Sequence, residues 1–169
     1  FKRSSWTEQV VEAILYLLWD LGLKVGQSSR SLDETVKMAQ EDLTIRTALL
    51  ESRFVWGDRG VYEEVSLRFW NEVVANTASD FVRLKMMERD DRHRRMGDSR
   101  YVVEPNIKDG KGGLRDLHTL YWIGKYIHKV SAASELVDVG LLTIDEYNRF
   151  RKAENFLWAV RCHMHNITG

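Results

Sequence analysis

Apolar residues recur every three or four positions along most of the chain, the spacing that places them on one face of an α-helix. A four-residue stretch after the first periodic segment, Leu23–Gly26, is too short for a helix and follows a helix-ending Gly22, so we interpret it as a short strand. The predicted class is mainly α, a bundle-like helical domain with one or two short strands near the N-terminus. The pattern predicts helices over residues 5–20, 31–40, 43–57, 62–96, 114–129, 131–140 and 143–166.

Helix-capping signals support several of these boundaries. Ser31 is followed three residues later by Glu34, and Thr143 by Glu146, which is the spacing of a capping box. Asp42 precedes another apolar repeat and is expected to cap the helix that begins there. The six tryptophans fall mostly at apolar helical positions, so we expect them in the core.

Charge and cysteine content exclude several classes of protein. The chain has 169 residues with 25 Lys+Arg and 25 Asp+Glu, so its net charge of zero does not favour a nucleic-acid partner. No apolar run is long enough to span a bilayer, and the start of the chain lacks the pattern of a signal peptide. A single cysteine, Cys162, excludes an internal disulfide, and we expect it to be a packed residue in a cytoplasmic protein. The first residue is not Met, which suggests a piece of a longer chain.

The segment "EPNIKDGKGGLRDLHTLYWI" (104–123) interrupts the helical pattern with three glycines. Glycine permits positive φ, and a helix that begins directly afterwards directs its unpaired amides and its dipole toward the same place. Positive side chains surround this point, so the segment is either a cradle for phosphate or a plain turn between helices. It matches neither the Walker A pattern nor the dinucleotide-binding glycine fingerprint. The positive residues are Lys108, Lys111 and Arg115.

Other candidate residues carry weaker signals. His118 lies one turn into the helix that follows the glycines. A lone histidine at such a position is more often a surface or hydrogen-bonded residue than a catalytic one. His163 and His165 are two apart, which separates them around a helix and makes a metal pair unfavourable. The stretch 83–100 has an excess of Lys and Arg, and either forms a solvated face or a basic rim that faces phosphate.

Three stretches together resemble the bacterial uridylyltransferases that modify the PII nitrogen signal protein. They are "EQVVEAILYLLWDLGLKVGQSSRSLDE" (8–34), "AQEDLTIRTALLESRFVWGD" (39–58) and "YVVEPNIKDGKGGLRDLHTLYWI" (101–123). A Gly-Gly-hydrophobic-Arg-Asp turn also occurs in the adenylyltransferase of glutamine synthetase, which is the alternative enzyme. A non-catalytic helical interaction module is the alternative from another class.

The resemblance implies a multidomain enzyme that transfers UMP from UTP to a tyrosine of PII in a Mg²⁺-dependent nucleotidyltransferase domain. A separate phosphohydrolase domain would remove the UMP, and regulatory domains would sense glutamine. Residues 1–58 would be the C-terminal part of the nucleotidyltransferase domain, and residues 59–169 the helical domain after it. The Asp-x-Asp pair that holds Mg²⁺ in such enzymes is absent, so the chain alone is expected to be inactive.

The resemblance also suggests roles for particular residues. Asp42 is the candidate for a further metal-supporting carboxylate, with a helix cap as its alternative role. Asp116 is expected to hold Arg115 in place. The basic residues Arg92, Arg94 and Arg95 are weaker candidates for contacts with phosphate, with PII or with solvent. The candidates for binding the nucleotide phosphates are Lys108, Lys111, Gly112, Gly113, Arg115 and Asp116.

Overall fold

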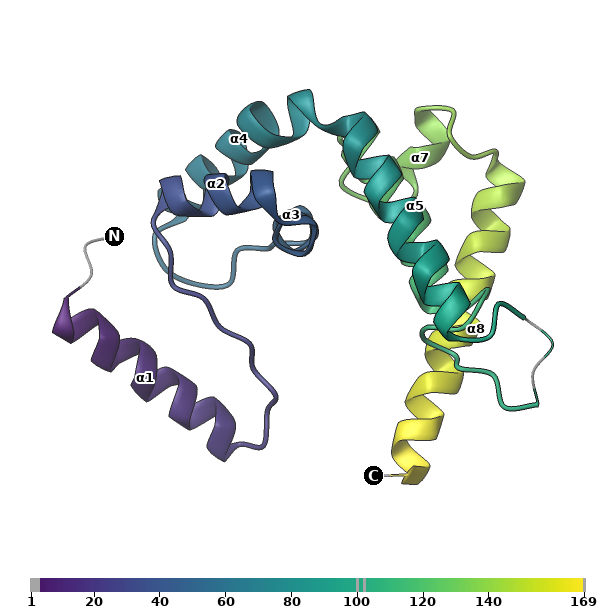
Figure 1. Cartoon of the computed structure of the whole chain (residues 1–169), viewed down its shortest axis with the longest axis horizontal. Helices are drawn as coiled ribbons and strands as arrows, with labels where there is room; N and C mark the ends of the chain where they lie inside the picture. Colours follow the sequence, from purple (N-terminus) through teal and green to yellow (C-terminus); the bar gives the residue numbers. More distant parts are fainter. Residues whose placement is uncertain (1–3, 100, 102, 169) are drawn as a thin grey trace. The chain divides into compact units, whose positions relative to one another are not determined.

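The computed structural model describes residues 4–99, 101 and 103–168 (Figure 1). The described residues are mainly helical and contain no strand, which confirms the predicted mainly-α class. No helix among them is long and apolar enough to cross a membrane. The elements in chain order are α1 (Ser5–Asp20), α2 (Leu32–Glu41), α3 (Leu43–Leu50), α4 (Arg59–Arg68), the π-helical η1 (Phe69–Val73), the 3₁₀-helical η2 (Val74–Asn76), α5 (Ala78–Arg95), α6 (Leu114–His128), α7 (Glu135–Asp138) and α8 (Ile144–Thr168).

The strand predicted at Leu23–Gly26 is wrong, because these residues adopt no regular structure. A strand is stable only when a neighbouring strand pairs with its backbone amides and carbonyls. No described segment forms such a ladder with these residues. The preceding boundary is as predicted, with Gly22 at φ +76° just after the end of α1.

The chain divides into two compact units, which are described separately. The first consists of residues up to Leu49 together with Arg53–Val73, and the second of Leu50–Ser52 together with Val74 onward. The division near Val73 falls within the π and 3₁₀ turns. The domain boundary predicted after residue 58 comes from the resemblance and stays a prediction.

In the first unit, α2, α4 and η1 pack around the buried side chains of Val36, Ala39, Phe69 and Val73. The Ser31–Glu34 capping box opens α2 as predicted. Arg46 from α3 is buried, and its guanidinium donates to the carbonyl oxygens of Ala39 (2.9 Å) and Gln40 (2.6 Å). These are carbonyls of the last turn of α2, which lack helical partners, so Arg46 fixes α3 against the end of α2.

Three helices predicted from periodicity differ in extent. The one predicted over 131–140 is reduced to the single turn of α7, Glu135–Asp138. The helix predicted to reach residue 57 ends at Leu50, because Phe54 packs 5.8 Å from the ring of Tyr62 in α4 instead of continuing the turn. The helix predicted over 62–96 is interrupted between Arg68 and Ala78. A π turn (Phe69–Val73) followed by a 3₁₀ turn (Val74–Asn76) occupies this interruption.

The second unit has its core between α5, α6, α7 and α8. The ring of Phe81 in α5 stacks on that of Tyr126 in α6, with centroids 3.9 Å apart and planes 5° from parallel. The Tyr126 hydroxyl lies 2.7 Å from that of Thr77, at the start of α5. α8 opens with the predicted Thr143–Glu146 capping box. The contacts of Phe81 and Thr77 with Tyr126 fix α5 against α6, the two helices that flank the glycine segment.

The prediction that the tryptophans form the core is wrong for most of them. Trp122 is buried, whereas Trp6 is 70% exposed, Trp56 92% and Trp158 41%. Cys162, expected to be packed, is also exposed. Periodicity shows that a helix has an apolar face, but it does not show what covers that face.

Replacing Phe81 by Ala should lower the free energy of unfolding by about 3–5 kcal/mol, because a fully buried ring would leave a cavity against Tyr126. Urea denaturation followed by circular dichroism measures this change. Met87→Ala, on the exposed side of the same helix, should change it by less than about 0.5 kcal/mol. Equal effects of the two substitutions would contradict the assigned core.

Candidate functional site

The glycine segment begins with a turn organised by Asn106. The side-chain oxygen of Asn106 accepts hydrogen bonds from the amides of Lys108 (3.0 Å) and Asp109 (2.8 Å). Its backbone carbonyl accepts from the amide of Gly110 at 2.9 Å. This turn is built by the side chain of one residue and reverses the chain just before α6.

Glycine is required at two positions of this loop because other backbone atoms approach closely. A Cβ at Gly110 would lie 2.6 Å from the carbonyl oxygen of Asn106, and one at Gly113 would lie 2.7 Å from that of Ile107. Gly112 has φ +81°, which favours glycine for a conformational reason. The three glycines therefore make a compact loop that a larger residue would force open.

The amides expected to face a phosphate have partners within the chain. The amide of Gly113 donates to the carbonyl of Gly110, that of Leu114 to Ile107, and that of Arg115 to Lys108, at 2.9–3.0 Å. Gly112 donates to the carboxylate of Asp116 at 2.7 Å. Any anion at this loop would thus meet side chains rather than these amides. The phosphate-binding role assigned to Gly112 and Gly113 stays a prediction.

The carboxylate of Asp116 joins the loop to α5. Arg92 donates to Oδ1, and Nε2 of His93 lies 2.9 Å from both carboxylate oxygens. Arg92 is buried and Asp116 is mostly buried. Burial alone would raise the pKa of Asp116, but the hydrogen bonds from Gly112, His93 and Arg92 outweigh it and hold that pKa below its ordinary value.

The predicted pairing of Asp116 with Arg115 is wrong, since Asp116 binds Arg92, His93 and Gly112. Arg115 points elsewhere: its Nε lies 3.8 Å from Asp109, and its guanidinium lies 5.5 Å from the centre of the Trp122 ring. Successive residues on a helix point about 100° apart, so Arg115 and Asp116 face different surroundings.

Sequence reasoning missed the structural role of Arg92 and His93. Arg92, a candidate together with Arg94 and Arg95 for contacts with phosphate, PII or solvent, is buried against Asp116. Arg94 pairs with Asp91 on the surface. The ion pair between Arg92 and Asp116 joins residues 24 positions apart in the chain, and a single sequence carries no local signal for such a pair.

The candidate phosphate-binding residues do not share one hollow. Two hollows, each of about 450 Å³, are lined by different members of the set. Lys111, Gly112 and Asp116 line the hollow between α5 and α6, whereas Lys108 lines the one beside α8. Arg115 belongs to neither lining. The remaining residues around the α5–α6 hollow are Met86, Arg89, His93, Thr119, Leu120 and Ile123.

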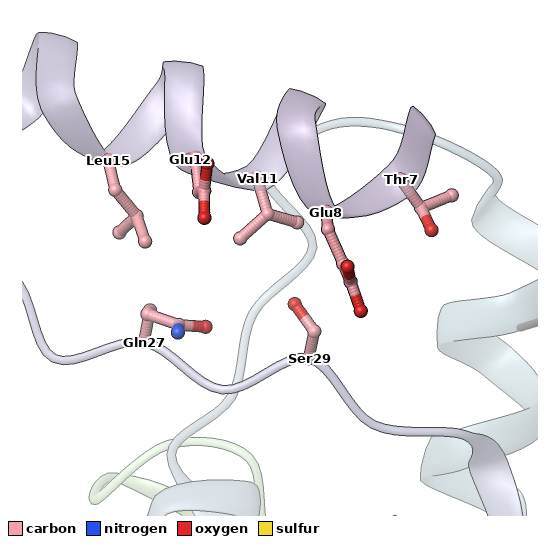
Figure 2. Close-up of a pocket in the computed structure, with 7 residues that line it drawn as sticks. All are labelled: Thr7, Glu8, Val11, Glu12, Leu15, Gln27 and Ser29. Atoms are coloured by element: carbon pink, nitrogen blue, oxygen red, sulfur yellow. The ribbon is translucent and has the colours of Figure 1, made fainter. Parts of the chain in front are cut away.

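A smaller hollow of about 280 Å³ lies in the first unit (Figure 2). Figure 2 shows Gln27 and Ser29, from the segment after α1, facing the side chains of α1 that include Glu8 and Glu12. None of the residues predicted to bind phosphate lines it. Nor do its two carboxylates form part of a metal site, because the described residues contain no group of three His, Cys, Asp or Glu that could hold an ion.

Asp42 forms the helix cap that was its alternative role. Its Oδ1 accepts from the amides of Thr44 (2.6 Å) and Ile45 (3.0 Å) at the start of α3. The amide of Ile45 is the largest cause of its lowered pKa. The metal-supporting role of Asp42 stays a prediction.

His118 is half-buried and lies near two indole rings. Its ring centre is 5.7 Å from that of Trp122 and 6.3 Å from that of Trp158. Burial, together with the nearby charge of Arg115, lowers the pKa of His118. Its surroundings therefore favour the neutral imidazole, which lies close to the two indole rings.

Gly113→Ala should reduce the free energy of unfolding by about 1–3 kcal/mol, because the added methyl group would overlap the carbonyls of Ile107 and Gly110. Urea denaturation provides the measurement. Gly26→Ala is the matched control, since a Cβ there meets nothing within 4 Å and should not destabilise the chain. Indistinguishable curves for the two variants would rule out the close loop described here.

Asp116→Asn should lower the free energy of unfolding by about 3 kcal/mol near neutral pH, because it leaves the buried charge of Arg92 uncompensated. The carboxyl has a lower pKa folded than unfolded, so its contribution is present above about pH 4 and is lost as the pH falls through the folded pKa. The difference between wild type and variant should therefore stay constant near neutral pH and shrink as the pH falls below about 4. Urea denaturation at several pH values tests this, and a difference that does not depend on pH would contradict it.

Comparison with known proteins identifies the family. The profile of the family described as GlnD PII-uridylyltransferase matches residues 80–169. The chain is 74% identical over 167 residues to the bifunctional uridylyltransferase/uridylyl-removing enzyme of Novosphingobium aromaticivorans, which covers 99% of this chain and 18% of the relative. Proteins of the same name from Erythrobacter litoralis and Rhodospirillum rubrum are 68% and 58% identical, with the same shares covered.

The chain thus spans about a fifth of the length of these relatives. No solved structure shows significant similarity to it. The resemblance noted from the glycine loop and the two preceding stretches is confirmed along the whole chain. This chain belongs to the PII-uridylyltransferase family.

Proposed function

We propose that this chain is part of a bifunctional enzyme that transfers UMP from UTP to a tyrosine of the PII protein and also removes it. The observation that carries the proposal is the 74% identity, over 99% of the chain, to a relative named for both activities. The proposal also places the enzyme in the cytoplasm, where nucleoside triphosphates are made.

In this function, the chain would supply positive side chains that bind the nucleotide. It would not supply the ligands of the Mg²⁺ ion. The resemblance implies Mg²⁺, but the described residues do not fit a magnesium site, since no three carboxylate, histidine or cysteine side chains come together. We therefore assign no step to an ion held by these residues. We also propose that the 169 residues by themselves do not catalyse the transfer.

The glycine loop is the element that we assign to nucleotide binding. Close backbone contacts at its glycines and the hydrogen bond from Gly112 to Asp116 hold the backbone of the loop in place. The side chain of Lys111 extends from this backbone beside the α5–α6 hollow. A backbone that is already fixed loses less conformational entropy when a triphosphate binds. Lys108 and Arg115 carry positive charge on other sides of the loop and would attract the same anion from a distance.

A graft tests the proposed function. The matching segment of the Novosphingobium aromaticivorans enzyme is replaced by this chain, and transfer of labelled UMP to the PII protein of that organism is measured. Because the segments are 74% identical, we expect transfer within about tenfold of the parent enzyme.

The 169-residue chain alone serves as the negative control and should transfer no UMP. A graft that folds, as judged by circular dichroism and thermal melting, yet transfers no UMP would contradict the proposal.

A further inference from the structure

The cations around the glycine loop differ in how firmly they are engaged. Arg92 is buried and its charge is neutralised by Asp116. Lys111 instead pairs with Asp98, whose side chain is 63% exposed, at 2.9 Å. Arg89 pairs with its neighbour Asp90, at 2.7 Å on the surface. Exposed pairs of this kind contribute little free energy, so Lys111 and Arg89 can exchange them for a ligand at small cost.

These two exchangeable cations line the same hollow. The hollow lies between α5 and α6 beneath the glycine loop, and its volume of about 450 Å³ is in the range of small-molecule sites. Arg89 contributes from α5 and Lys111 from the loop, with His93 also in the wall. The one acidic residue in the lining, Asp116, is already bound to Arg92, His93 and Gly112. The polar part of the hollow therefore suits an anion.

The rest of the wall is apolar. Met86 from α5 and Leu120 and Ile123 from α6 contribute side chains to the lining, and Leu120 is 39% exposed. A hollow with cations and an adjoining apolar surface matches a ligand that has an anionic end and a flat or apolar body. A free inorganic anion would use only the first of these features.

We infer that the α5–α6 hollow binds the nucleotide, with Arg89 and Lys111 contacting its phosphates and Leu120, with Met86 and Ile123, contacting its nucleoside part. The inference rests on the proposed function for the identity of the nucleotide. It assigns a binding role to Arg89, one residue of the basic stretch 83–100 that the sequence did not single out. It also separates Lys111 from Lys108, which lines the hollow beside α8 and would not contact the same phosphates.

Calorimetric titration of the grafted enzyme without PII tests the inference. UTP and inorganic tripolyphosphate are titrated separately into the graft and into its Arg89→Gln and Lys111→Ala variants. Each substitution should weaken the binding of both ligands at least about tenfold, because each removes a charge-assisted contact with phosphate. Arg83→Gln is the matched control: Arg83 lies on the same helix, pairs with Asp80 at 2.6 Å and is exposed. It should leave both affinities unchanged.

Leu120→Ser distinguishes the two ends of the ligand. It should weaken the binding of UTP several-fold and leave tripolyphosphate unaffected, since only the nucleoside part would contact the apolar wall. Circular dichroism and thermal melting of each variant show whether it is folded. If tripolyphosphate and UTP lose affinity equally, the nucleoside half of the inference is wrong.

The outcomes separate the inference from the proposed function. UTP affinities that are the same in the graft, Arg89→Gln and Lys111→Ala would overturn the inference, while UMP transfer by the graft would still support the function. Conversely, UTP binding that depends on both residues without any UMP transfer would support the inference and contradict the function. A folded graft that binds no UTP would overturn the inference.

Discussion

The carboxylate of Asp116 is the interaction on which the geometry of the glycine loop depends. It accepts hydrogen bonds from Arg92 and from the amide of Gly112, and it lies 2.9 Å from the ring nitrogen of His93. One side chain of α6 thereby ties together α5 and the loop between the two helices. Removing it would leave the buried guanidinium of Arg92 without a counter-charge, which is more costly than the loss of a surface ion pair.

This tie determines how the loop could contact an anion. In phosphate-binding loops that begin a helix, free backbone amides surround the phosphate. Here the amides of Gly112, Gly113 and Leu114 donate to Asp116 and to carbonyls of the loop itself. The loop would therefore contact an anion through its side chains. Because the affinity would depend on the charges of lysine and arginine, it would decrease as the salt concentration rises.

Local signals in the sequence determined much of the fold. The capping boxes at Ser31 and Thr143 and the extent of α1 were predictable, because a cap and a periodic face depend on residues within a few positions of one another. The break between Arg68 and Ala78 was not, because the apolar repeat runs through it and no glycine or proline marks it in the sequence.

The candidate site was predictable only in part, for the same reason. The glycines and Lys111 are adjacent in the chain, so their association with the start of α6 could be predicted. The contact of Arg92 with Asp116 crosses 24 residues, and the same arginine-rich stretch contains exposed Arg94. Composition alone could not distinguish a buried arginine from a solvated one.

The position of Lys108 and Lys111 shows why sequence proximity is a poor guide to shared function in such a loop. They are three residues apart, yet each lines a different hollow because the Asn106 turn reverses the chain between them. Arg89, 22 residues before Lys111, shares its hollow instead. If the α5–α6 hollow holds the phosphates, this part of the enzyme would bind and orient the nucleotide. Any metal used in the proposed transfer would need ligands from outside the described residues, which contain no group of three His, Cys, Asp or Glu that could hold an ion.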